Sequence, residues 1–224
     1  MNLQAIERET APNPSASIVI LHGLGADGND FVSFVDELDL RSVGPVRFVF
    51  PHAPTRPVTL NGGYVMRAWY DIFGLDAKER REDEAGLRES QALVEGLIAK
   101  EKARGVKANR IVLAGFSQGC AMTLMTGLRH HERLAGLVGL SGYLPLAAKA
   151  EAERHTANRD VPIFLAHGTA DPVIPIARAR QSHDALVALG HEVEWHEYPM
   201  PHSVCGPEIE DLERWLCRQL GAAT

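Results

Sequence analysis

The segment 110–119 constrains this chain more than any other, because a short apolar run there leads into a serine held between two glycines. Ile111–Leu113 favour a buried strand, and the residues after the turn favour a helix. In a sharp strand-to-helix turn the central serine adopts a strained backbone conformation that exposes its hydroxyl, and flanking glycines avoid clashes with neighbouring backbone. Gly115 and Gly119 fit this need, so the segment predicts Ser117 as a nucleophile. The same motif also arises by chance, so its context has to decide.

Two backbone N–H groups are expected to hold an oxyanion beside this serine. The N–H of Gln118 would start the helix, where the helix dipole also favours negative charge. The second would come from the glycine-rich loop after an apolar run at 17–21, and Leu24 is best placed to supply it. This loop lacks the Lys-Ser/Thr ending of a phosphate-binding loop and the third glycine of a dinucleotide site. A loop that only makes a tight turn stays open as the alternative.

Length, charge and cysteine content indicate the class of protein. A chain of 224 residues with 45% hydrophobic residues can bury one sizeable core, so we expect a single domain over 1–224. A net charge of −6 argues against nucleic acid or an anionic membrane as partner. Cys120, Cys205 and Cys217 form neither an even disulfide set nor a zinc motif, which favours a reducing compartment. The N-terminus is too polar for a signal peptide and no run reaches bilayer length, so we expect a cytoplasmic protein without stable membrane insertion.

Short apolar runs alternate with segments of helical periodicity along the chain. This order predicts an α/β fold, with a mostly parallel sheet, helices on both faces and a ligand site at the carboxyl ends of the strands. The expected strands occupy 17–21, 46–50, 111–113, 134–140, 161–166 and 191–198. The expected helices run from 29 or 30 to about 38, over 84–104, 120–128 and 176–189, and through a closing segment with Ile209, Leu212, Trp215 and Leu216.

An irregular hairpin is expected over 58–69, with its turn at 61–63. Its apolar residues Leu60, Met66 and Trp69 would form one wall of an acyl-binding pocket. The alternative is that they only cover the edge of the sheet. The charged run at 76–84 indicates a solvated loop or the start of a helix.

A serine nucleophile needs an imidazole base, and the imidazole needs a carboxylate that holds it in one tautomer. His202 follows the last expected strand, and Asp171 follows the strand before it, at the same edge of the sheet as Ser117. The order Ser117, Asp171, His202 is that of α/β-hydrolases.

The other histidines fit less well. His22 and His167 lie beside glycines at strand ends, where structural hydrogen bonds are expected. His130, His131 and His155 lie in polar segments that should be exposed. A metal site would have to use His191, Glu194, His196 and Glu197, which follow one strand without ligand spacing, so no metal is expected.

With these residues in hand, the chain resembles the phospholipase/carboxylesterase family, which includes acyl-protein thioesterases, lysophospholipases and small bacterial carboxylesterases. The resemblance is carried by Leu21–Gly25, Pro51–Thr59, Trp69–Ile72, Gly115–Gly119 and Tyr198–His202. It implies the α/β-hydrolase fold, a triad of Ser117, Asp171 and His202, oxyanion donors at Leu24 and Gln118, no cofactor, and a homodimer as one option. The region of Tyr64 is most similar to the bacterial carboxylesterases. Two departures are Cys120, where the family has a further glycine, and the Arg-Ala pair at 67–68 near the expected pocket entrance.

The sequence thus favours a serine carboxylesterase that hydrolyses short to medium acyl esters through an acyl-enzyme on Ser117. An acyl-protein thioesterase or a lysophospholipase is the alternative within the enzymes. A binding protein without catalysis is a further alternative, although such a role would not need a nucleophile, a base and an acid together. The expected partner is a small acyl ester or thioester.

Overall fold

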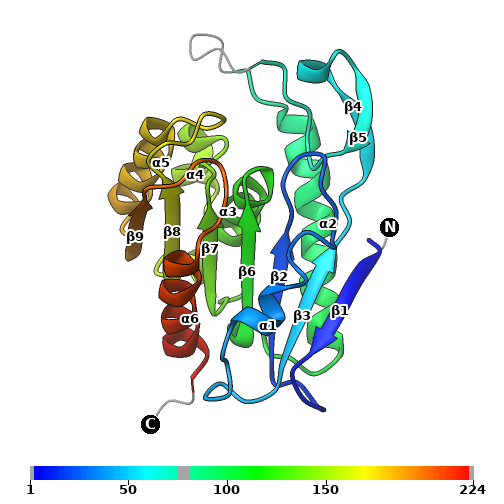
Figure 1. The fold of residues 1–224 in the computed structure, drawn as a ribbon, viewed down its shortest axis with the longest axis vertical. Helices are drawn as coiled ribbons and strands as arrows, with labels where there is room; N and C mark the ends of the chain where they lie inside the picture. Colours follow the sequence, from blue (N-terminus) through cyan, green and yellow to red (C-terminus); the bar gives the residue numbers. More distant parts are fainter. Residues whose placement is uncertain (1–2, 75–80, 222–224) are drawn as a thin grey trace.

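A mostly parallel sheet forms the centre of the molecule. The computed structural model describes residues 3–74 and 81–221. Its main sheet has seven strands in the order β1-β3-β2-β6-β7-β8-β9 (Figure 1). The edge strand β1 pairs antiparallel with β3, and every other pairing in this sheet is parallel. The α/β prediction is therefore confirmed.

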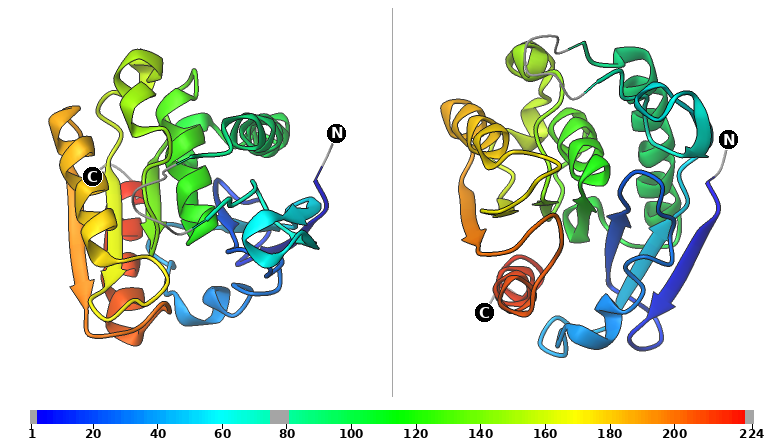
Figure 2. Two further views of the ribbon diagram at one scale, coloured as in Figure 1. Left: turned by 90° about the horizontal axis from the view of Figure 1, so that it is seen from above. Right: turned by 45° about the horizontal axis from the view of Figure 1, so that its top comes forward.

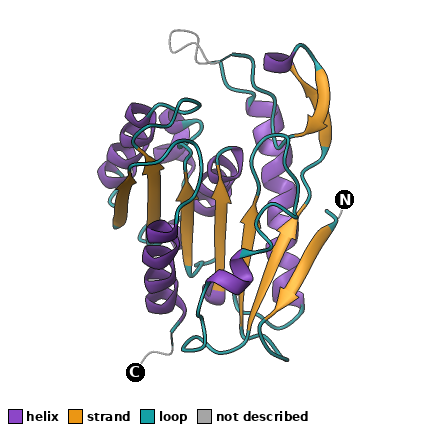
Figure 3. Ribbon diagram, viewed as in Figure 1, coloured by secondary structure: helices purple, strands orange, loops and turns teal. Residues whose placement is uncertain are grey.

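Strands β2, β3, β6, β7 and β8 follow apolar runs of the sequence, and in Figure 3 the strands lie side by side with helices around them. The main sheet comprises β1 (Ala5–Glu9), β2 (Ala16–Leu21), β3 (Val46–Pro51), β6 (Ile111–Phe116), β7 (Gly136–Leu140), β8 (Ile163–Gly168) and β9 (Val193–Tyr198). The helices are α1 (Phe34–Glu37), α2 (Glu84–Ala103), α3 (Gln118–Arg129), α4 (Ala147–Glu153), α5 (Ile176–Ala188) and α6 (Gly206–Leu220), with 3-10 turns η1 (Thr59–Asn61), η2 (Ala108–Arg110) and η3 (Thr156–Asn158).

Helices cover both faces of this sheet. Seen from above, α1 and α6 lie on one side and α2, α3, α4 and α5 on the other (Figure 2). The central strand β2 is buried on both faces, because Ile18 and Ile20 belong to the core under α1 and α6 while Val19 and Leu21 belong to the core under α2 and α3. Such two-sided burial explains the continuous apolar runs of the sequence.

Three elements differ from the sequence prediction, and one of them is helix α4, which lies in a polar, alanine-rich segment for which no helix is predicted. Strand β1 is not among the predicted strands, since its short sequence with three consecutive charged residues lacks the apolar run of a buried strand and suits an edge. The helix expected from 29 or 30 to 38 is wrong in length, because α1 spans only Phe34–Glu37. Residues 29–35 instead form successive i→i+3 turns, and Ser33 gives no side-chain cap, so only one helical turn forms around the buried Phe34.

The predicted hairpin is confirmed as a separate two-stranded sheet of β4 (Thr55–Val58) and β5 (Tyr64–Arg67). Gly62 and Gly63 turn it with φ of 65° and 81°, a backbone region that favours glycine. It stands above the carboxyl ends of β2 and β3 in Figure 1. The charged run at 76–84 lies partly outside the described residues, and α2 begins within it at Glu84.

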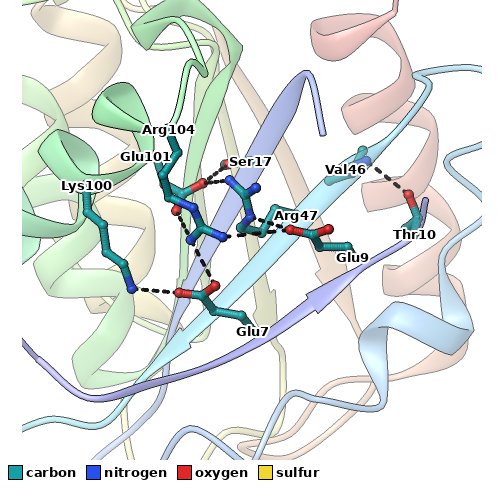
Figure 4. Close-up of polar contacts among 9 residues, drawn as sticks. All are labelled: Glu7, Glu9, Thr10, Ser17, Val46, Arg47, Lys100, Glu101 and Arg104. Atoms are coloured by element: carbon teal, nitrogen blue, oxygen red, sulfur yellow. Dashed lines mark hydrogen bonds and ion pairs between the residues drawn. The ribbon is translucent and has the colours of Figure 1, made fainter. Parts of the chain in front are cut away.

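A polar network joins β1 and α2 to the first residues of β2 and β3 (Figure 4). It lies at the end of the sheet opposite the carboxyl ends of the parallel strands. The buried Glu101 of α2 accepts hydrogen bonds from Ser17 at 2.5 Å, Arg47 at 2.7 Å and Arg104 at 3.0 Å. The other members are Glu7, Glu9 and Lys100. We call these seven residues the basal network.

Candidate active site

Ser117 lies in the strained turn that the sequence predicts. It joins β6 to α3 with φ of 55° and ψ of −115°, outside the regions that a serine readily adopts. Its backbone N–H donates to the carbonyl of Leu140 at 2.8 Å, which fixes the turn against β7. A Cβ at Gly115 would lie 2.3 Å from the backbone of Gly119, and a Cβ at Gly119 would lie 2.0 Å from the carbonyl oxygen of Leu21. Both glycines are therefore required by close approach.

His202 links this serine to a buried carboxylate. The Nε2 atom of His202 lies 2.9 Å from the hydroxyl oxygen of Ser117, and its Nδ1 atom lies 2.6 Å from Oδ2 of Asp171. Because a carboxylate only accepts, Nδ1 carries the proton and the lone pair of Nε2 faces the serine hydroxyl. The three side chains thus form one hydrogen-bonded chain at the carboxyl ends of β6, β8 and β9.

The two loops that carry Asp171 and His202 are joined by their backbones. Thr169 donates to the carbonyl of Tyr198 at 2.8 Å, and Ala170 donates to that of Met200 at 3.2 Å. A Cβ at Gly168 would lie 2.4 Å from the carbonyl oxygen of Met200, so only glycine permits this approach. The relative position of the acid and the base is therefore set by backbone contacts.

The two expected oxyanion donors lie on segments that touch. The glycine-rich loop packs against the elbow, since a Cβ at Gly23 would lie 3.4 Å from the Cβ of Ser117. Within the described parts of the chain, neither the N–H of Leu24 nor that of Gln118 donates to a protein acceptor. Both N–H groups are therefore left without a protein acceptor in the part of the chain that the structure describes, as the predicted role requires.

His22 shapes the glycine-rich loop from beneath. The N–H of Ala53 donates to its Nε2 at 3.0 Å, so its Nδ1–H donates to the carbonyl of Gly23 at 2.7 Å. Burial lowers the pKa of His22, which keeps it neutral with this pair of bonds. The expected structural role of His22 is confirmed.

The side chain of Gln118 is a contact that sequence reasoning missed. Its Oε1 accepts from the N–H of Trp69 at 2.8 Å, and its Nε2 donates to the carbonyl of Tyr70 at 2.7 Å. The start of α3 is thereby fixed to the segment after β5. The sequence predicts a role only for the backbone N–H of Gln118, but the side chain also holds the backbone at Trp69 and Tyr70 in place. The only sign of this role in the sequence is the residue type, because an amide side chain can donate and accept at once.

The three expected pocket residues lie in different environments. Trp69 is 0% exposed and donates from Nε1 to the carbonyl of His22 at 2.9 Å, so its ring supports the loop from inside. Leu60 is 37% exposed on the 3-10 turn of the hairpin. Met66 is half-buried, and its sulfur would lie 3.7 Å from a Cβ at Gly25. Met66 is thus brought to the glycine-rich loop, Leu60 lies out on the hairpin, and Trp69 is buried against the start of the loop.

The prediction that His130 is exposed is wrong. It ends α3 as a buried cap, and its Nδ1 lies 2.6 Å from Oε2 of Glu95. Among the described residues, Glu95, His130 and the exposed His131 form one group whose ligand atoms lie within 4.8 Å of one another. Since α3 has 12 residues and begins beside Ser117, this group lies about 18 Å from the serine. It has no place in the chemistry of the site.

Cys120 lies directly behind the elbow. Burial raises the pKa of its thiol to about 12, so it carries no thiolate that could compete with the serine. A Cβ at Gly142 would lie 2.3 Å from the Cβ of Cys120. The Cys120 side chain therefore fills the space between α3 and the segment that follows β7.

Comparison with known proteins agrees with this geometry. The family model described as phospholipase/carboxylesterase matches residues 1–219. The chain belongs to this family. It is 42% identical over 206 residues to acyl-protein thioesterase 1 of Yarrowia lipolytica, covering 90% of this chain and 91% of the relative. It is also 42% identical over 214 residues to acyl-protein thioesterase 1 of Neurospora crassa, covering 92% and 87%.

Solved structures of this family have the same fold. SOBER1 of Arabidopsis thaliana aligns with a TM-score of 0.87 at 30% identity, covering 92% of this chain and 99% of that one. Acyl-protein thioesterase 2 of Zea mays aligns with a TM-score of 0.84 at 31% identity, covering 96% and 99%. The protein is accordingly an α/β-hydrolase and a serine hydrolase that acts on ester bonds, which favours the enzyme over the binding protein without catalysis.

Proposed function

We propose that this family member hydrolyses acyl thioesters and esters as an acyl-protein thioesterase, with Ser117 as nucleophile, His202 as general base and acid, and Asp171 as the group that orients the imidazole. The hydrogen-bonded chain of 2.9 Å and 2.6 Å through His202 carries this proposal. The same three residue types in the same hydrogen-bonded arrangement perform acyl transfer on several unrelated scaffolds, although their order along the chain differs.

The first half-reaction acylates the serine. The hydroxyl oxygen of Ser117 attacks the acyl carbonyl carbon while its proton moves to Nε2 of His202. The carbonyl oxygen becomes an oxyanion that accepts from the backbone N–H groups of Leu24 and Gln118. The carbon–sulfur bond of the thioester, or the carbon–oxygen bond of an ester, then breaks, and the leaving thiol or alcohol takes the proton from His202.

The second half-reaction frees the enzyme. Water gives a proton to Nε2 of His202 and its oxygen attacks the acyl carbon on Ser117. The bond to the serine oxygen breaks, and that oxygen recovers the proton from His202. The products are a carboxylic acid and the starting enzyme.

The names of the relatives support thioesters as the preferred substrate class over the short to medium esters that the sequence first favoured. An acyl chain would need a hydrophobic wall, and we propose that Met66, which lies beside the glycine-rich loop, and Leu60 supply it. Trp69 would act through the loop that it supports. A cytoplasmic location, a single domain and a homodimer stay predictions. In the described ranges, every helix is too short or too polar to span a bilayer.

The test combines a serine-directed probe with matched substrates. A fluorophosphonate should label the wild type and fail to label Ser117→Ala. The kcat/KM for a peptide S-acylated on cysteine should exceed that for the O-acyl serine peptide with the same chain. A preference for short p-nitrophenyl esters would instead support the carboxylesterase, and cleavage of lysophospholipid alone would support the lysophospholipase. No labelling of the folded wild type would contradict the mechanism.

A further inference from the structure

A second imidazole lies beside the carboxylate of Asp171. His167, the second-last residue of strand β8, is fully buried, and its Nε2 lies 3.3 Å from Oδ2 of Asp171. This is the oxygen that His202 approaches to 2.6 Å. The other oxygen, Oδ1, accepts from the backbone N–H groups of Val173 at 2.8 Å and Ile174 at 2.9 Å. Three N–H groups therefore bind this carboxylate, and the Nε2 atom of His167 lies beside it.

The tautomer of His167 follows from its other contact. Its Nε2 lies 2.8 Å from the carbonyl oxygen of Ile174, which only accepts, so Nε2 carries the proton. Its Nδ1 is buried without a hydrogen-bond partner among the described residues, so a second proton there would be buried and unpaired. Burial accordingly lowers the pKa of His167 and keeps it neutral.

This N–H group thus donates to the carbonyl of Ile174, and the carboxylate of Asp171 in the same turn lies 3.3 Å from its nitrogen. Because Ile174 also donates to Oδ1 of Asp171, the turn closes on itself around the imidazole. A free carboxylate could rotate about its last bond and leave His202 without a partner, and the imidazole beneath it opposes this rotation.

We propose that His167 is a positioning residue: its Nε2–H holds Asp171 and Ile174 in one turn, so that Oδ2 stays directed at His202. This inference rests on the proposed function, since it assigns a role in orienting the base. A histidine that only fills the core would not affect the orientation of His202, whereas His167 in this role would.

The molecule contains a matched control in His191. This residue is also buried, its Nδ1 lies 3.3 Å from the carbonyl oxygen of Val161, and its Nε2 has no partner among the described residues. Burial lowers its pKa as well. It precedes β9, however, and therefore lies at the edge of the sheet opposite Asp171.

The experiment compares His167→Asn, His167→Gln and His191→Gln. The amide of Gln reaches the place of Nε2, whereas that of Asn reaches only the place of Nδ1. His167→Asn should lower kcat about 10- to 100-fold with KM within about twofold, and His167→Gln should recover most of this loss. His191→Gln should lower the midpoint of urea unfolding yet keep the wild-type kcat.

A second measurement does not depend on substrate. The proton of the 2.6 Å contact between His202 and Asp171 should give a far-downfield proton NMR signal in the wild type, in His167→Gln and in His191→Gln. It should broaden or move upfield in His167→Asn. Wild-type kcat and an unchanged signal in His167→Asn would overturn the proposal, as would equal kcat losses in His167→Asn and His191→Gln. A wild type that neither hydrolyses acyl substrates nor labels at Ser117 would overturn the proposed function, and this inference with it.

Discussion

The two edges of the sheet each bury a carboxylate, and each surrounds it differently. At the edge where β2 and β3 begin, Glu101 is 1% exposed and faces the guanidinium groups of Arg47 and Arg104. At the opposite edge, the partners of Asp171 in the described chain are two backbone N–H groups and two imidazoles.

This difference suits Glu101 to stabilising the fold and Asp171 to proton transfer. The basal network sets three carboxylates, Glu7, Glu9 and Glu101, against three basic groups, Arg47, Lys100 and Arg104, so its formal charges cancel. Arginine does not release its proton in proteins, and such a network can only hold elements together. An imidazole changes charge near neutral pH, so a carboxylate that faces one can support proton transfer.

The largest expected effect is on activity at the upper edge. Asp171→Asn should lower kcat about 10⁴-fold, because an amide no longer holds the proton of His202 on Nδ1. The urea midpoint should change little, since the amide oxygen can still accept from Val173 and Ile174. Steady-state kinetics and urea unfolding on the same preparation check both halves. A large loss of stability with modest loss of kcat would reverse the assignment of the two edges.

The converse change at the basal network should leave chemistry intact. Glu101→Ala removes the shared partner of two arginines and Ser17, and should lower the free energy of unfolding by about 3 to 5 kcal/mol. At a temperature where the variant stays folded, its kcat should equal that of the wild type. The exposed Glu151, which pairs with Arg154, provides a control whose removal should change stability by less than about 0.5 kcal/mol.

Local sequence signals predicted most of the sheet and the three side chains that the structure joins through His202. The apolar runs of β2, β3 and β6 are continuous because these strands are buried on both faces, and that pattern is visible without tertiary information. The two glycines that flank Ser117 predict its strained turn. Strand β1 gives no such signal, because an edge strand is specified by its pairing with β3 rather than by its own residues.

The supporting contacts were not predictable, because they join distant residues through single hydrogen bonds. Gln118 contacts Trp69 across 49 positions, and Glu101 contacts Ser17 across 84. The buried position of His130 likewise depends on Glu95 from another helix. No periodicity or motif encodes these partners, although the residue types can be recognised once the fold is known.

A third buried carboxylate sharpens the comparison, because it has neither cation nor imidazole among the described residues. Glu208 is fully buried at the start of α6, where Oε2 accepts from the N–H of Cys205 at 3.4 Å and Oε1 has no partner. Burial raises its pKa from 4.5 to about 8. The folded state therefore binds this proton more tightly than the unfolded chain.

Stability should fall as pH rises between about 4.5 and 8, because the folded state must either keep the proton or bury a charge. Glu208→Gln removes this titration and keeps an acceptor for Cys205. At pH 8 the variant should be more stable than the wild type by at most about 4 kcal/mol, and at pH 4.5 the two should be similar. Urea unfolding across this range checks the slope. Parallel curves for both proteins would show that another group sets it.

The smallest effect is expected for a polar contact that lies near Ser117 but, in the described chain, bonds to none of the three residues of the proposed triad. The hydroxyl groups of Tyr70 and Tyr143 lie 2.8 Å apart in a buried pair beside the elbow, and the guanidinium of Arg178 stacks on the ring of Tyr143. Tyr143→Phe keeps the stacked ring but leaves the hydroxyl of Tyr70 without its partner, so it should lower the free energy of unfolding by about 1 to 2 kcal/mol.

Neither tyrosine contacts Ser117, His202 or Asp171 through a hydrogen bond in the described structure, so kcat in Tyr143→Phe should stay within about twofold of the wild type. The double change Tyr70→Phe with Tyr143→Phe removes both polar groups and should recover part of the lost stability, because no hydroxyl is then left unpaired. A tenfold loss of kcat in Tyr143→Phe at unchanged stability would contradict this prediction. It would show that residues near the carboxyl ends of the strands contribute to catalysis without a hydrogen bond to Ser117, His202 or Asp171.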